Sequence, residues 1–155
     1  MYLSLSVAAV FLLVAVLGYA MLLGVRRAQQ NAKELVHKFR IAFENSFDHM
    51  ILTDIDGVIQ FANDSVTKVT GYSVLEVIGK TPALWGGQMS EDFYRDFWKT
   101  IKTDKKEFVG VIRNMRKGGE LYIAEVRIIP ILERERLTGF LGIERDITPK
   151  SATAS

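Results

Sequence analysis

The sequence predicts an α+β domain: an antiparallel five-stranded sheet with short helices on one face, preceded by a transmembrane helix and a helical stalk. Three observations support this prediction. Residues 2–25 carry no charged side chain, and residues 50–80 have the pattern of a strand hairpin followed by two short helices. Residues 108–147 have the pattern of longer strands joined by tight turns. Strands and helices segregated in this way are typical of an α+β fold.

Composition excludes several classes of function. The chain has 155 residues, with 20 Lys+Arg against 18 Asp+Glu, so no overall charge favours nucleic acid or an acidic substrate. It contains no cysteine, which excludes disulfides, thiolate catalysis and cysteine-ligated zinc or iron–sulfur clusters.

The first 25 residues are predicted to anchor the chain in a membrane. About twenty apolar residues in a helix span the hydrocarbon core of a bilayer. A cleaved signal peptide is the alternative, but it needs a positively charged leading region, and no Lys or Arg precedes Phe11. Arg26, Arg27 and Lys33 follow the apolar run. By the positive-inside rule we expect a single-pass protein of the cell membrane with everything after residue 25 in the cytoplasm.

Residues 26–46 are predicted to form a helical stalk, because they contain good helix formers and neither Gly nor Pro. Small and apolar residues recur at alternating spacings of four and three, as in a heptad seam: Ala28, Ala32, Leu35, Phe39, Ala42 and Ser46. The alternative is a solvated helix that only leads into the domain. The seam favours a homodimer, since two tethered copies have a high effective concentration.

The domain is predicted to open with a hairpin. Residues 50–53 and 58–61 are short apolar strands, and residues 54–57 between them end in Gly57, which can adopt positive φ. Asn63 or Asp64 can cap the next helix, which ends at Gly71. Ser73 can then cap a second short helix, which Gly79 closes.

The second half of the domain is predicted to contain a longer helix and three strands. Ser90 caps the helix, and Phe93, Phe97 and Ile101 follow at helical spacing. The strands cover residues 108–115, 120–132 and 139–147. Gly118-Gly119 forms the first turn between them, and the charged residues 133–136 form the second loop.

The order of these motifs resembles that of a PAS domain. The chain shares seven motifs with members of that family, in the same order: an aspartate–glycine turn, an apolar pair, a helix-initiating Asn, a Gly-Tyr-Ser, an Ile-Gly-Lys, a basic hairpin turn and a closing Asp-Ile-Thr. Here these are Asp56-Gly57, Val58-Ile59, Asn63, Gly71-Tyr72-Ser73, Ile78-Gly79-Lys80, Arg116-Lys117-Gly118-Gly119 and Asp146-Ile147-Thr148. The resemblance covers residues 39–148 and leaves residues 149–155 as a disordered tail.

The resemblance implies a sensory or relay module in signal transduction, with a pocket between sheet and helices and an output partner such as a histidine kinase. We expect no enzymatic activity. Neither His37 nor His49 lies near a catalytic Asp/Ser constellation in the sequence, no Walker-type loop is present, and no kinase or cyclase region follows Thr148.

The resemblance leaves the cofactor open. Haem-binding members use a histidine in the long helix or the loop after it, and residues 90–106 have none; light-sensing flavin members use a cysteine, which is absent. Members that bind FAD non-covalently have an aromatic long helix, a Trp at the next strand and Asn-Arg-Arg-Lys. This chain has the aromatic residues of 93–98, Phe108 in place of that Trp, and Asn114-Met115-Arg116-Lys117. An FAD-binding redox sensor is therefore the alternative to a sensory or dimerisation module whose pocket is empty or holds an unidentified ligand.

We predict that a ligand would lie between the helices and the inner face of the sheet. The predicted wall residues are Trp85, Phe93, Phe97 and Trp98, and the predicted polar contacts are Asn63 and Asn114. Strand alternation places Asn114 on the same face as Ile112. Two alternatives stay open: the aromatic side chains are ordinary core, and Asn114 bonds backbone near the turn.

Overall fold

The computed structural model describes residues 2–149 and the side chains of residues 7–149. The predicted tail of residues 149–155 lies outside the described residues except for Pro149. The chain divides into two compact units, one up to Ala42 and the other from Phe43 onward.

The first unit is most of one helix, α1 (Tyr2–Glu44). Among the described residues, α1 is the helix long enough and apolar enough to cross a membrane. Within it the stalk residues Leu35 and Phe39 are 69% and 58% exposed. Apolar side chains this exposed in the stalk are what an intermolecular seam requires.

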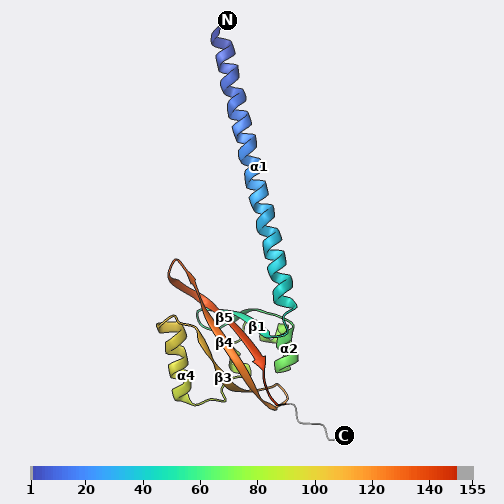
Figure 1. The fold of residues 1–155 in the computed structure, drawn as a ribbon, viewed down its shortest axis with the longest axis vertical. Helices are drawn as coiled ribbons and strands as arrows, with labels where there is room; N and C mark the ends of the chain where they lie inside the picture. Colours follow the sequence, from blue (N-terminus) through green and yellow to red (C-terminus); the bar gives the residue numbers. More distant parts are fainter. Residues whose placement is uncertain (1, 150–155) are drawn as a thin grey trace. The chain divides into compact units, whose positions relative to one another are not determined.

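The second unit contains a five-stranded antiparallel sheet (Figure 1). The strands are β1 (His49–Asp54), β2 (Ile59–Ala62), β3 (Phe108–Met115), β4 (Leu121–Glu133) and β5 (Arg136–Asp146). Their order across the sheet is β2-β1-β5-β4-β3, so the two ends of the domain sequence pair at the centre through β1 and β5. The predicted α+β fold and five-stranded sheet are confirmed.

Short helices connect β2 to β3. They are α2 (Ser65–Thr70), α3 (Val74–Val77), the 3₁₀ turn η1 (Pro82–Leu84), α4 (Glu91–Trp98) and the π-helical turn η2 (Lys99–Thr103) that continues α4. Two of the predicted helix ends are confirmed. Gly71 ends α2 at φ 79°, and the Ser90 hydroxyl accepts a hydrogen bond from the Phe93 N–H at the start of α4. Asp64 occupies the N-cap position of α2 without a side-chain capping bond.

The β4–β5 hairpin is tighter than the sequence predicts. The sequence predicts a loop over residues 133–136 and a strand from Gly139, but the ladder continues to the pair Glu133↔Arg136. Only Arg134 and Glu135 form the turn, at φ 49° and 66°. Two residues with positive φ match the twist of a hairpin, so strand pairing extends to the tip although no glycine is there.

One face of the sheet carries the core. Ile51 of β1 and Ile59 of β2 pack with Val66 of α2 and Val77 of α3. Further along the same sheet, Phe140 of β5 packs against Ile101 of η2, with Phe97 of α4 beside it. The helices therefore cover this face in two groups, and the cavity described next lies among the residues of both groups.

Candidate ligand-binding site

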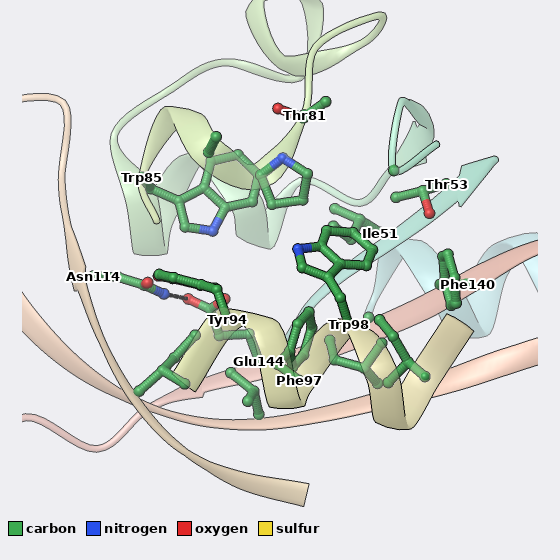
Figure 2. Close-up of a pocket in the computed structure, with 18 of the residues that line it drawn as sticks. Ile51, Thr53, Thr81, Trp85, Tyr94, Phe97, Trp98, Asn114, Phe140 and Glu144 are labelled. Carbon is green, nitrogen blue, oxygen red and sulfur yellow. Dashed lines mark hydrogen bonds between the residues drawn. The ribbon is translucent and has the colours of Figure 1, made fainter. Parts of the chain in front are cut away.

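A cavity of about 410 Å³ lies inside the second unit (Figure 2). Its lining comes from the inner face of β1, β3, β4 and β5 and from η1, α4 and the loops beside them. This volume falls within the range of small-molecule sites in proteins.

Most of the wall is apolar, and aromatic rings form a large part of it. Figure 2 shows Trp85 on one side and Tyr94, Phe97 and Trp98 of α4 on the other. Phe97 and Trp98 meet edge to face with ring centroids 5.3 Å apart, and Trp98 meets Phe140 at 6.2 Å. Rings held by such contacts present flat surfaces on which another ring can stack.

A buried polar cluster interrupts this wall. Glu144 of β5 accepts hydrogen bonds from the Tyr122 hydroxyl at 2.6 Å and from the Asn114 amide nitrogen at 3.0 Å. Asn114 of β3 also lies 3.4 Å from the Tyr122 hydroxyl. Three strands thus bring one carboxyl, one amide and one phenol together on the inner face.

His49, the first residue of β1, lies beside this cluster. Its ring meets Trp85 edge to face at 5.1 Å, and its Nδ1 lies 3.9 Å from Oε1 of Glu144. That distance is too long for a hydrogen bond. His49 therefore neighbours the carboxyl without bonding it.

Burial determines the protonation of these groups. Burial lowers the pKa of His49 to about 4, so its ring is neutral near pH 7. Burial raises the pKa of Glu144, while hydrogen bonds from Tyr122, Asn114 and Trp85 oppose that rise. Burial and the neighbouring Glu144 also raise the pKa of Tyr122, which stays a neutral donor.

Three buried polar atoms of the cavity lining have no hydrogen-bond partner among the described residues: Nδ1 and Nε2 of His49 and Oδ1 of Asn114. His49 is 1% exposed and Asn114 is 0% exposed. Buried polar atoms are nearly always paired, and leaving one unpaired costs about 1–3 kcal/mol. All three unpaired atoms belong to side chains that line one cavity, so a ligand there could satisfy them.

Four of the six predicted site residues line the cavity: Trp85, Phe97, Trp98 and Asn114. Phe93 does not; it packs outside the lining against Phe97 and Phe108, at 6.3 and 5.8 Å. Asn114 faces inward with Ile112, as strand alternation predicts, and it bonds the side chains of Tyr122 and Glu144 rather than backbone near the turn.

Asn63 is also absent from the lining. Its amide nitrogen donates to the carbonyl oxygens of Phe43 and Asp48, each at 3.0 Å, and its amide oxygen accepts from the Met50 N–H at 2.9 Å. These bonds join the segment before β1 to the start of α2. The observed contacts of Asn63 are thus with backbone.

His49, Tyr122 and Glu144 were not predicted as site residues. Glu144 could have been found by alternation, because it shares a face of β5 with Phe140 and Gly142. His49 likewise shares a face with Ile51. The sequence near each residue could not have shown that His49 and Glu144 lie close together, because their proximity depends on the pairing of β1 with β5.

The fold and this cavity define a sheet-and-helix domain built around a small-molecule-sized site. Residues 48–149 match the PAS domain family, and the chain therefore belongs to that family. PAS domains are sensory modules rather than catalytic ones, and within the described residues no group of three or more His, Asp or Glu could hold a metal ion.

Similar proteins are regulators. The chain is 30% identical over 99 residues to a nitrogen fixation regulatory protein of Klebsiella oxytoca, covering 63% of this chain and 20% of that protein. It is 34% identical over 102 residues to a bacterioopsin transcriptional activator of Halobacterium salinarum, covering 64% and 15%. Related PAS domains also occur in an aerotaxis receptor and in histidine kinases. The chain thus spans a fifth or less of the length of these two regulators.

Among solved structures, the PAS domain of a protein from Colwellia psychrerythraea superimposes with a TM-score of 0.67 at 27% identity. The match covers 74% of this chain and 98% of that domain.

Proposed function

We propose that this chain is a membrane-anchored PAS sensor that binds a small molecule in its cavity and relays the binding event to a signalling protein such as a histidine kinase. The observation that carries the proposal is the set of unpaired buried atoms of His49 and Asn114 in an otherwise mostly apolar cavity. A ligand with a flat apolar body and a polar edge would satisfy both parts of this wall.

The membrane anchor rests on α1, whose apolar stretch is followed by Arg26 and Arg27. Regulatory and sensory proteins among the relatives support the relay role. In this proposal the domain itself lies in the cytoplasm, where the partner can reach it, and the exposed stalk holds two copies together.

A redox-sensing domain that binds FAD is the second candidate. Trp85, Phe97 and Trp98 could hold the flavin ring, and Asn114 could accept a hydrogen bond from a ring N–H. The flavin, when bound, would supply the electron chemistry. No Lys or Arg occurs among the described residues that line the cavity, so the phosphates would need to lie outside it.

The test starts with the absorption spectrum of the purified full chain, because an oxidised flavin is yellow, and with mass spectrometry of molecules released on denaturation. Asn114→Ala should then reduce the amount of co-purified ligand and lower the melting temperature, since Glu144 loses a donor. Loss of stability in this variant with no ligand in the parent protein would mean that Asn114 is structural and would contradict the site.

A further inference from the structure

We propose that the ligand is a primary aryl-alkyl amine, with its ring between the aromatic walls and its ammonium group at Glu144, Asn114 and His49. The inference rests on the proposed function and names the chemical class that this cavity takes. It follows from the charge of the lining, from the kind of unpaired atoms there and from the position of the aromatic rings.

The lining contains acidic side chains and no basic ones. Its described residues include two carboxyl groups, those of Asp56 and Glu144, and no Lys or Arg. Asp56 has an outside partner, since the Lys102 ammonium lies 3.4 Å from its carboxylate. Glu144 is 8% exposed and receives hydrogen bonds only from neutral groups. Burial without a cation raises the pKa of Glu144, so a cationic ligand beside it would stabilise the carboxylate form that burial disfavours.

The unpaired atoms are suited to a hydrogen-bond donor. Oδ1 of Asn114 can only accept, and a neutral imidazole such as that of His49 has one accepting nitrogen. Glu144 adds a third acceptor, 3.9 Å from His49 Nδ1 and 3.0 Å from the Asn114 amide nitrogen. A primary ammonium has three donors and no acceptor. Its three N–H groups therefore match three acceptors that lie together.

The aromatic rings lie next to this polar corner. Trp85 contacts His49 at 5.1 Å, and Trp85 and Trp98 face the same space (Figure 2). An ammonium near an indole gains cation–π attraction, and an aryl ring gains stacking surface from Phe97 and Trp98. An amine on a short alkyl chain from an aromatic ring would meet both needs.

The experiment compares two ligands of nearly the same shape, 2-phenylethylamine and 2-phenylethanol, on the purified full chain at pH 7. Binding is measured by calorimetry, and by melting temperature as a second readout. We expect the amine to bind about tenfold more tightly than the alcohol, because a charge-assisted hydrogen bond is about twice as strong as a neutral one and a difference of about 1.4 kcal/mol is tenfold in affinity. In Glu144→Gln the preference should fall to about twofold or less.

Glu125→Gln is the matched control. Glu125 lies on β4 with its side chain exposed and pairs in register with Arg145, so this variant removes the same charge outside the cavity. It should keep the full preference for the amine.

Equal binding of amine and alcohol by the parent chain, or an unchanged preference in Glu144→Gln, overturns the inference, as does the absence of amine binding. Binding of the alcohol alone would also overturn it while leaving small-molecule sensing intact. The proposed function fails on a different result, namely a parent protein that releases no ligand and in which Asn114→Ala changes stability alone.

Discussion

At the scale of single residues, His49 has the environment least expected of its type. It is enclosed by Trp85 and the inner sheet, and burial holds its pKa at about 4. In the unfolded chain a histidine has a pKa of about 6.5. Between these two pKa values the unfolded chain binds more protons than the folded one. The free energy of unfolding is therefore unaffected by His49 protonation above pH 6.5, and it decreases as the pH falls below that value.

We therefore predict that this histidine destabilises the fold by about 3 kcal/mol as the pH falls from 6.5 to 4. Urea denaturation of the parent chain and of His49→Gln at several pH values measures the difference, and the variant should lack this part of the pH dependence. Glu144 acts in the opposite direction through its raised pKa, and it is present in both proteins. His37→Gln, at an exposed position of α1, is the control and should follow the parent; a His49→Gln profile parallel to the parent would contradict the prediction.

Asn63 and Asn114 show how far sequence reasoning reaches at this scale. Both were predicted as polar contacts of a ligand, and both are fully buried. One binds backbone carbonyls near the start of the domain, and the other lines the cavity. The difference arises from partners 8 to 30 residues away in the chain, which spacing alone does not reveal.

At the scale of elements, the contact between β1 and β5 depends on a glycine. Gly139 pairs with Asp54, and a Cβ at this position would overlap the carbonyl oxygen of Thr53. Overpacking of this kind costs about 1–3 kcal/mol or more, because the backbone must move.

Gly139→Ala should therefore lower the free energy of unfolding by at least about 1 kcal/mol, measured by urea denaturation. Gly118→Ala is the matched control, since nothing lies within 4 Å of a Cβ there and the position is in a turn. Equal free energies of unfolding for the two variants would contradict the prediction, because they would mean that β1 and β5 can accommodate a Cβ at position 139 without destabilising the fold.

The stalk offers a second prediction for an element. If the seam of α1 joins two copies, Leu35→Asp and Phe39→Asp each place a charge in an apolar interface and should weaken the dimer. Cross-linking in membranes measures this effect. His37→Asp adds the same charge off the seam and should leave the dimer unchanged. A parent chain that never cross-links would rule out the seam.

At the scale of the whole molecule, the distribution of charge along α1 predicts the orientation in the membrane. Arg26, Arg27 and Lys33 follow the apolar stretch, so a reporter fused after Ser155 should behave as a cytoplasmic protein. Paired fusions, one active only in the cytoplasm and one active only outside it, measure the orientation. Clear activity of the external reporter would contradict it. Arg26→Gln with Arg27→Gln should weaken the bias.

The sequence by itself predicted the class of fold and the order of the elements. It also predicted the turn at Gly57, the helix end at Gly71 and the helix cap at Ser90, because these features depend on periodicity and turn chemistry within a few residues. Only the tertiary structure brought Glu144 to within 3.9 Å of His49 Nδ1 and left Oδ1 of Asn114 without a partner beside them. These residues lie on β1, β3 and β5, far apart in the chain, and their shared environment exists only once the strands pair and burial shifts their pKa values.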